Sequence, residues 1–193
     1  PDIYDVPVLG GGSGGYACAL RSAQLGLRVA LIERDKLGGT CLHRGCIPTK
    51  ALLHAAEVAD TAREGARVGV NSSVGSIDMS AVLRYQQGVV SRLHKGLQGL
   101  VSAATIDYVD GFGDVTSPTT VRVGDRTLTG RRLVLATGSR ARSLPGLEIG
   151  GRVLTSAQAL GLTQGPPSVI VLGGGVIGVE FASVFRSFGA SVT

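Results

Sequence analysis

The sequence predicts an α/β fold class with a parallel sheet, and three observations support this prediction. Residues 3–33 follow a strand–turn–helix–strand order, in which short apolar runs flank a helical pattern. The same order returns at residues 168–193. Between the two copies, residues 105–135 alternate between apolar and polar and are broken by Gly, Asp and Pro. The first two observations are typical of βαβ units, and the third is typical of a small antiparallel meander.

The opening segment predicts two buried strands joined by a helix. The short apolar runs at residues 3–9 and 28–33 are expected to be strands covered on both faces. Residues 16–25, rich in Ala and Leu, are expected to form the helix between them. Pro7 stands inside the first strand, where it cannot donate to a hydrogen-bond ladder. Either that strand is locally distorted or Pro7 is a peculiarity of this chain.

Two helices, the meander and a return strand are expected in the middle of the chain. An apolar stripe predicts a helix over residues 46–63, and a second helix is expected over residues 80–103. Residues 105–135 follow as the meander. The run LVLATGS at residues 133–139 predicts a strand that returns to the main sheet.

The chain is expected to contain one nucleotide-binding domain and the start of another. Residues 141–167 are rich in Pro, Gly and Ser around a short helical patch at residues 156–160, which is typical of a linker. We therefore predict a first domain at residues 1–145, a linker at 146–167 and a truncated second domain at 168–193. The two copies of the opening pattern lie too far apart for a repeat array, so they indicate two related units.

Composition and charge exclude several function classes. Hydrophobic residues make up 44% and charged residues 17% of the 193 residues, which indicates a globular chain that can bury a core. The net charge of +5 comes from scattered arginines, so we expect a solvated basic surface or an acidic ligand and no nucleic-acid partner. No stretch of about 18 apolar residues and no signal or transit pattern is present, so no membrane is expected.

The first glycine motif predicts nucleotide binding. Gly10, Gly12 and Gly15 form a G-x-G-x-x-G motif between the first strand and its helix. The first glycine permits the tight turn, the second lets a pyrophosphate approach the backbone, and the third lets helix and strand pack closely. The phosphate would lie at the helix N-terminus, where unpaired N–H groups face it. Glu33 ends the second strand, the position from which an acid binds ribose hydroxyls. The arrangement is Rossmann-like.

A second motif of the same kind lies near the end of the sequence. Gly173, Gly175 and Gly178 repeat the spacing, and Glu180 follows them. The acid expected about 20 residues further on would fall past Thr193, so we expect this unit to be incomplete and the chain to be a fragment. The glycine at the third position favours NAD over NADP.

The stretch GGTCLHRGCIPTK at residues 38–50 contains two cysteines, for which we consider three kinds of site. Cys41, His43 and Cys46 are possible metal ligands, but C-x4-C without a second pair is not the usual zinc spacing, so no metal is expected. A structural role for both thiols is the second alternative. The third is a redox pair. Three cysteines, an odd number, argue against a secreted disulfide scaffold and favour a reducing cytoplasm.

The redox interpretation explains more of this stretch than the other two. Cys46 stands near the start of a helix, where free N–H groups favour a thiolate, and Lys50 adds a positive charge one turn later. Glu33 is only eight residues before Cys41, so a dinucleotide held by the first unit could extend its reactive ring to the thiols. A flavin exchanges electrons with a dithiol whereas NAD alone does not, so we expect the dinucleotide to be FAD.

These motifs resemble those of the flavin disulfide reductases. The stretch GGTCLHRGCIPTKALLH, with GGGSGG before it and GGGVIGVEFA after it, is similar to the matching segments of that family, and the resemblance covers the whole chain. The family contains dihydrolipoamide dehydrogenases together with glutathione and mercuric reductases. The run CIPTKALL, in place of the CVPKK common in glutathione reductases, resembles the dihydrolipoamide dehydrogenase branch.

The resemblance implies a role for each matching residue. Cys41 would be the interchange thiol, and Cys46 would face the flavin and form the charge-transfer thiolate. Lys50 would lie near flavin N5, paired with Glu180. The other implied contacts are Gly10, Gly12 and Gly15 at the FAD pyrophosphate, Glu33 at the adenosine ribose, Gly39 and Thr40 at the ribityl–phosphate arm, Gly113 at the adenine, Thr137, Gly138 and Ser139 at the FAD exit, and Gly173, Gly175, Gly178 and Glu180 on the NAD side.

The resemblance also implies an activity and its partners. An NAD-dependent dihydrolipoamide dehydrogenase would reoxidise dihydrolipoamide through a Cys41–Cys46 disulfide and FAD, as a homodimer that serves a lipoyl domain of 2-oxo acid dehydrogenase complexes. The family's general base is a His oriented by a Glu, and His43, His54 and His94 do not match it, so the fragment itself is expected to be inactive. The alternatives are another flavin disulfide reductase, of the mercuric or glutathione type, and a nucleotide-binding fragment without turnover.

Overall fold

The computed structural model describes residues 2–193, which form two compact units. The first unit contains the chain up to His43 together with Ser91–Arg140. The second contains Arg44–Val90 and Ala141–Thr193. These units group residues by packing and do not follow the predicted domains along the chain, whose boundaries stay a prediction. Each unit is described by itself.

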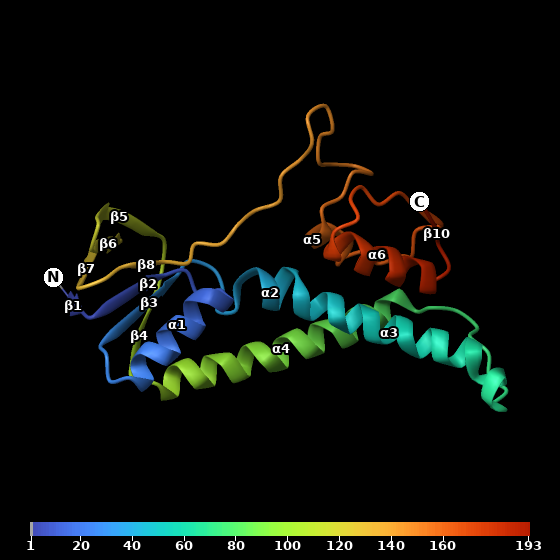
Figure 1. The fold of residues 1–193 in the computed structure, drawn as a ribbon, viewed down its shortest axis with the longest axis horizontal. Coiled ribbons are helices and arrows are strands. Elements are labelled where there is room, and N and C mark those ends of the chain that lie inside the picture. The colour runs from blue at the N-terminus through green and yellow to red at the C-terminus, as the bar shows by residue number, and fades with distance from the viewer. Residues whose placement is uncertain (1) are drawn as a thin grey trace. The chain divides into compact units, whose positions relative to one another are not determined.

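The first unit contains a four-stranded parallel sheet in the order β4-β3-β2-β8 (Figure 1). Its strands are β2 (Val6–Leu9), β3 (Val29–Glu33), β4 (Ile106–Asp110) and β8 (Val134–Leu135), and every adjacent pair is parallel. Helix α1 (Ser13–Gln24) crosses between β2 and β3 and packs on both. The predicted α/β class, the first βαβ unit and the return strand are therefore confirmed.

A second, mixed sheet of the first unit has the order β1-β7-β6-β5. Strands β5 (Gly113–Ser117), β6 (Thr120–Val123) and β7 (Arg126–Gly130) form the predicted antiparallel meander, and β1 (Asp2–Tyr4) pairs with β7 in parallel. A hydrophobic cluster joins side chains of both sheets, namely Tyr4, Ala30, Ile32, Val109, Val121, Val123 and Leu128. The core of this unit therefore lies where the two sheets pack together.

The prediction that the meander begins at residue 105 is wrong. Residues 106–110 form β4, which pairs in parallel with β3 and belongs to the main sheet. Strand β4 is at the edge of that sheet, so Val109 is buried in the core whereas Tyr108 keeps 39% of its surface exposed. An edge strand with one solvated side alternates in the same way as an antiparallel strand, and the alternation alone could not separate the two.

The expectation of one strand over residues 3–9 also needs correction. The chain bends at Asp5, so β1 and β2 lie in different sheets. Pro7 fits within β2, because the Val6 and Gly10 N–H groups donate on the β3 side and the alternation turns the Pro7 nitrogen toward β8. Pairing with β8 begins only at Val8, so no ladder bond is lost at Pro7.

The second unit is built on two packed helices, α3 (Cys46–Glu64) and α6 (Val176–Ser187), which lie side by side in Figure 1. Strands β9 (Ser168–Val169) and β10 (Ser191–Val192) flank α6 and pair in parallel, which confirms the second strand–helix–strand order. The short helices are α5 (Ser156–Ala159) and the 3-10 turn η1 (Gly65–Val68). The buried cluster of this unit contains Leu52, Ala56, Leu160, Phe181, Val184, Phe185 and Ala190.

Two further helices contribute residues to both units. Helix α2 (Gly39–Arg44) directly precedes α3, and α4 (Met79–Ala103) is the second helix that the sequence predicted. The bounds of α3 and α4 agree with the predicted 46–63 and 80–103 to within one residue. Within residues 2–193, no helix combines the length and the apolar character that a membrane crossing requires.

A polar cluster around the buried Tyr4 hydroxyl links β1, β4 and β7 in the first unit. The Tyr4 hydroxyl, on a residue only 3% exposed, donates to the Asp107 carboxylate. Arg126 Nη2 donates to Asp107 Oδ2 at 2.8 Å and to Asp2 Oδ2 at 2.9 Å. Although burial alone would raise the pKa of Asp107, the hydrogen bonds from Tyr4 and Arg126 lower it. Burial and the bond to Asp107 raise the pKa of Tyr4 to about 12.

The free energy of unfolding is therefore expected to fall at alkaline pH through Tyr4. Because the pKa is raised in the folded state, the neutral phenol stabilises the fold below pH 10.0, and this contribution disappears as pH rises toward 12. The loss amounts to about 2–3 kcal/mol. Urea unfolding at about pH 9 and about pH 11 would measure roughly half of it, because pH 11 lies midway between the unfolded and the folded pKa. Tyr4→Phe should flatten the decline, and Tyr16→Phe should leave it unchanged; an equal decline in both variants would contradict this assignment.

Candidate active site

The backbone of the first glycine motif is packed so tightly that two of its positions require glycine. Gly10 has φ +106°, and a Cβ there would lie 2.1 Å from the Ala136 carbonyl oxygen. A Cβ at Gly15 would lie 1.7 Å from the Gly10 carbonyl oxygen. The turn after β2, the first turn of α1 and the segment after β8 are therefore in close contact.

The N-terminus of α1 has the features of an anion site. Gly12 is the N-cap residue, and no side chain in the described part of the chain caps this helix. The first turn contains no acidic residue, and a Cβ at Gly14 would have no neighbour within 4 Å. Unpaired backbone N–H groups and the positive end of the helix dipole therefore face an open side, which suits the pyrophosphate of a dinucleotide.

The stretch before Cys41 lies directly against this loop. Gly12 and Gly38 form an isolated parallel β-bridge, and the Gly38 N–H donates to the Gly11 carbonyl at 2.8 Å. A Cβ at Gly39 would lie 2.7 Å from Gly12 Cα. The sequence suggested that the two glycines approach a ligand. In the structure they approach the nucleotide loop itself, and they bring the start of α2, with Thr40 and Cys41, beside it.

Glu33 is already used by the backbone around it. Its Oε2 accepts the Gly11 N–H at 2.7 Å, and its Oε1 accepts the N–H groups of Arg34 at 2.8 Å and Asp35 at 2.9 Å. Since a carboxylate has about four acceptor positions, Glu33 retains room for a ribose hydroxyl. The sequence assigned it only to the ribose, because its bonds to the loops on both sides depend on the folded backbone.

Glu33→Gln is expected to destabilise the protein even without a nucleotide. Glutamine keeps one acceptor oxygen and places an NH2 group against backbone donors, so at least one charge-assisted hydrogen bond is lost. The expected loss is about 1–3 kcal/mol in the free energy of unfolding. Chemical denaturation of flavin-free protein would measure it, with Glu148→Gln at an exposed position as the control. Equal stability of the two variants would show that these bonds contribute nothing.

The remaining predicted FAD positions lie around the same end of the parallel sheet. Thr137, Gly138 and Ser139 follow β8, and the Thr137 nitrogen would lie 3.1 Å from a Cβ at Gly10. Gly113 begins β5, where a Cβ would lie 2.6 Å from Leu9 Cδ1, at the end of β2. The structure thus brings Thr137 beside Gly10 of the nucleotide loop and Gly113 beside the end of β2.

The two cysteines of the predicted redox pair belong to consecutive helices. Cys41 is partly buried on α2, and Cys46 is the exposed first residue of α3. Gly45 is the N-cap residue between these helices, and Thr49 Oγ1 donates to its carbonyl at 2.6 Å. No disulfide joins the cysteines, including Cys18 on α1.

Lys50 and Glu180 form an ion pair within the second unit. Lys50 Nζ lies 2.5 Å from Glu180 Oε1, which is the pairing that the family resemblance implied. The Lys50 side chain is 58% exposed and the Glu180 side chain 20% exposed. Lys50 lies one turn after Cys46 on α3, so the pair joins the cysteine end of α3 to the first half of α6.

The second glycine motif repeats the geometry of the first. Gly173 has φ +111°, and a Cβ at Gly178 would lie 2.1 Å from the Gly173 carbonyl oxygen. Gly175 is the N-cap residue of α6 and has an extended conformation, as Gly12 has in α1. Identical spacing therefore produces the same turn twice, which supports the prediction of two related nucleotide-binding units.

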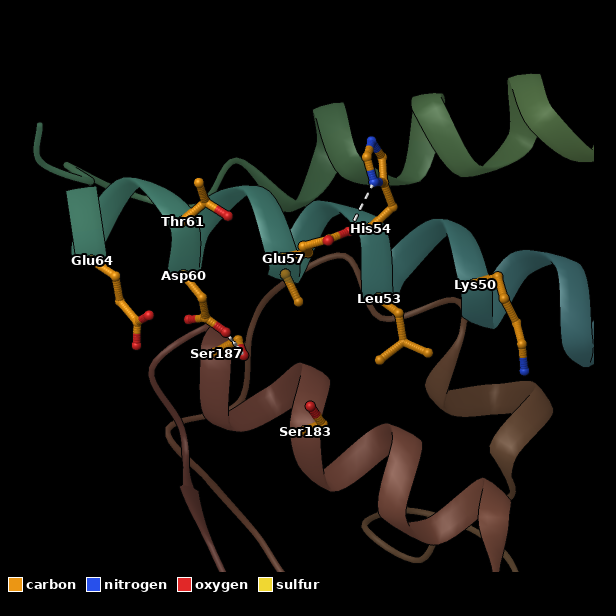
Figure 2. Close-up of a pocket in the computed structure, with 10 residues that line it drawn as sticks. Lys50, Leu53, His54, Glu57, Asp60, Thr61, Glu64, Ser183 and Ser187 are labelled. Carbon is orange, nitrogen blue, oxygen red and sulfur yellow. Dashed lines mark hydrogen bonds and ion pairs between the residues drawn. The ribbon is translucent and has the colours of Figure 1, made fainter. Parts of the chain in front are cut away.

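A pocket of about 560 Å³ lies along the groove between α3 and α6, and Figure 2 shows the residues that line it. Asp60 Oδ2 accepts a hydrogen bond from Ser187 Oγ at 2.6 Å across this groove. Among the lining residues the sequence assigned a site role only to Lys50, because the groove exists only once the two helices pack. The lining is Lys50, Leu53, His54, Ala56, Glu57, Asp60, Thr61, Glu64, Ser183 and Ser187. Among residues 2–193, no three His, Cys, Asp or Glu side chains are grouped to hold a metal ion.

Comparison with known proteins identifies the family. A sequence model of the pyridine nucleotide-disulphide oxidoreductases matches residues 4–193. Dihydrolipoyl dehydrogenase of Bacillus subtilis is 47% identical, with 98% of this chain and 43% of that protein covered. Dihydrolipoyl dehydrogenase of Acholeplasma laidlawii is 42% identical (98% and 58% covered), and leghemoglobin reductase of Vigna unguiculata is 40% identical (100% and 38% covered). The chain thus spans between about two-fifths and three-fifths of these relatives.

A solved structure agrees with this result. The HOCl-induced flavoprotein disulfide reductase of Escherichia coli superposes with a TM-score of 0.79 at 31% identity, covering 98% of this chain and 41% of that one. The match of sequence and fold extends over nearly all of the chain. The chain belongs to the pyridine nucleotide-disulphide oxidoreductase family.

Proposed function

We propose that this chain is part of an NAD-dependent dihydrolipoamide dehydrogenase, in which Cys41 and Cys46 form the redox disulfide and FAD occupies the first glycine motif. Homologues in this family use FAD and NAD(H). The single observation that carries the proposal is the contact between Gly39 and Gly12, because it attaches the helix of Cys41 to the nucleotide loop. Electron transfer between a thiol and a bound dinucleotide requires that the thiol lie beside the loop that binds the dinucleotide.

The residues present fit FAD. The uncapped N-terminus of α1 would hold the pyrophosphate, and Glu33 would accept a ribose hydroxyl. The resemblance assigns Thr40 to the ribityl–phosphate arm, Gly113 to the adenine and Thr137–Ser139 to the exit of the cofactor. Bound FAD supplies a ring that takes up two electrons from a dithiol and delivers them to NAD as hydride.

The chain's own chemistry is thiol–disulfide exchange. One thiolate of dihydrolipoamide attacks the Cys41 sulfur, the Cys41–Cys46 bond breaks, and Cys46 leaves as a thiolate. The second substrate thiol loses its proton to solvent and attacks the substrate sulfur bound to Cys41, so Cys41 leaves as a thiolate and lipoamide is released as a cyclic disulfide. The Cys41–Cys46 disulfide is thereby reduced by two electrons, the dithiol is oxidised by two electrons, and no other oxidant is needed.

The ion pair between Lys50 and Glu180 would provide fixed charge at the cysteine end of α3. Glu180 holds the Lys50 ammonium at 2.5 Å and limits where this flexible side chain points. A positive charge held one turn from Cys46 stabilises negative charge that develops on that sulfur when it leaves. The second motif, Gly173, Gly175 and Gly178, would hold the NAD pyrophosphate at the N-terminus of α6.

The proposal extends to the partners. A dihydrolipoamide dehydrogenase acts on a lipoyl domain of the 2-oxo acid dehydrogenase complexes, as a homodimer in the cytoplasm. The similar proteins favour this branch over the mercuric or glutathione type. The relatives from Bacillus subtilis and Acholeplasma laidlawii are both named dihydrolipoyl dehydrogenases.

A substrate comparison tests the proposal. The native polypeptide that contains this sequence, loaded with FAD, is assayed for NADH formation from dihydrolipoamide and NAD, and for NADPH oxidation with glutathione disulfide or Hg²⁺. Turnover with dihydrolipoamide at least about a hundredfold above the other two supports the proposal. Preference for either other substrate moves the protein to another branch. Flavin binding without turnover on any of them leaves only a nucleotide-binding function.

A further inference from the structure

Two histidines outside the proposed electron path contact each other in the first unit. His43 lies on α2, and the edge of its ring meets the His94 ring of α4, with centroids 4.8 Å apart and planes at 78°. His43 Nε2 donates to the Leu37 carbonyl at 2.8 Å. Both histidines are partly buried. The His43 imidazole, two residues after Cys41, is therefore held by a hydrogen bond and by a ring contact.

Helix α2 depends on such contacts because it is short. It has six residues, and an isolated helix of this length is not stable in water. Its Leu42 N–H reaches the Gly38 carbonyl only at 3.4 Å. What holds it is Gly39 against the nucleotide loop, the buried Leu42 side chain, and the hydrogen bond and ring contact of His43.

We propose that His94 is a positioning residue for Cys41, because its ring holds His43 in the orientation that binds Leu37 and thereby fixes α2. The inference rests on the proposed function only in taking Cys41 as the reactive thiol. His94 contacts the His43 ring. It acts through His43, and its effect is on where the Cys41 sulfur lies and how freely solvent reaches it.

The charge state of His94 gives this contact a pH dependence. Burial lowers the pKa of His94 below 6.5, and His43 on α2 and Lys36 in the preceding loop, the charged and titratable groups that act on it, have the same effect. A histidine whose pKa is lowered by folding stabilises the fold above its unfolded pKa and loses this contribution as pH falls through the folded value. Acid therefore weakens the ring contact.

Alkylation of the cysteines tests the inference without measuring turnover. The reduced native polypeptide is treated briefly with iodoacetamide, quenched and digested with trypsin. Lys36, Arg44 and Lys50 divide the region so that Cys41 lies in the peptide of residues 37–44 and Cys46 in that of residues 45–50. Each digest therefore reports the two rates separately.

His94→Ala is expected to raise the Cys41 alkylation rate at least about threefold, since a loosened α2 exposes the thiol more often. Cys46 should change less than about twofold, because the His43 contact of His94 is with α2. His94→Phe keeps an aromatic edge and should restore the native rate at neutral pH. Leu93→Ala, which removes an exposed neighbour on α4, should have no effect.

Two further results complete the test. His43→Ala combined with His94→Ala should be no faster than the faster single variant, because both act through one contact. Lowering the pH from about 7.5 to about 5.5 should raise the ratio of Cys41 to Cys46 labelling in the native protein more than in His94→Phe. An unchanged Cys41 rate in His94→Ala, or additive effects in the double variant, overturns the inference. Absence of turnover with dihydrolipoamide would instead contradict the proposed function and leave these rates interpretable.

Discussion

Replacement of Cys41 or Cys46 by serine is expected to abolish NADH formation from dihydrolipoamide, with a loss of at least about a thousandfold in turnover. Serine is close in size and polar, but it cannot form a disulfide or accept a thiolate attack at its oxygen. Either replacement therefore leaves the two substrate electrons without an acceptor on the chain. The measurement is steady-state NADH absorbance with purified, flavin-loaded variants at equal concentration.

The matched control is Cys18→Ser, on the partly buried face of α1. It should retain turnover within about threefold of the native protein, because Cys18 has no part in the exchange. A second readout separates lost chemistry from lost structure: NADH oxidation by a small quinone needs no thiol, so both cysteine variants should keep it. If Cys41→Ser retained a tenth of the native dihydrolipoamide turnover, the redox role of this pair would be rejected.

Gly15→Ala is expected to produce the largest structural effect of a single methyl group in this chain. The added Cβ would lie 1.7 Å from the Gly10 carbonyl oxygen, about half an ordinary contact distance, and this oxygen belongs to the backbone and cannot turn away as a flexible side chain could. Helix α1 must then move away from β2, which opens the turn that contains Gly12. We expect a loss of about 3 kcal/mol or more in stability and a flavin content below about a tenth of the native value.

Gly14→Ala is the control for this effect. It adds the same methyl group one residue earlier in the same helical turn, where nothing lies within 4 Å of the new Cβ. Its stability should stay the same or rise by up to about 1 kcal/mol, because alanine favours the helix. Urea unfolding of flavin-free protein measures the stability, and absorbance after reconstitution measures the flavin. Equal stability of the Gly14 and Gly15 variants would contradict the close packing of α1 on the Gly10 turn.

Several parts of the fold and site could be predicted because each depends on residues close together in the chain. The bounds of α3 and α4 follow from the spacing of apolar residues within one helix. The turns at Gly10 and Gly173 follow from the glycine spacing, since their positive φ angles exclude most other residues. The cysteine stretch at residues 38–50 likewise predicted that Cys46 lies at the start of α3.

Other parts could not be predicted, because they depend on which distant segments pair. The position of β4 in the main sheet was missed, because apolar and polar residues alternate in an edge strand as they do in a meander strand. The bend at Asp5 was missed because β1 and β2 pair with different strands in two different sheets. The bond of Glu33 to the Gly11 N–H was also missed, as was the contact of His43 with His94. The partners in these two contacts stand 22 and 51 residues apart in the chain.

Local sequence settles the two glycine turns, the long helices and the candidate cysteine pair, because backbone angles and helical period are properties of neighbouring residues. Tertiary structure alone decides that Gly39 touches Gly12, that Lys50 meets Glu180, and that His94 supports the helix of Cys41. The physical reason is that such contacts form only when burial of the sheet and helix faces brings distant segments together. The free energy of this burial arises between segments that are far apart in the chain, so no short stretch of sequence reveals it.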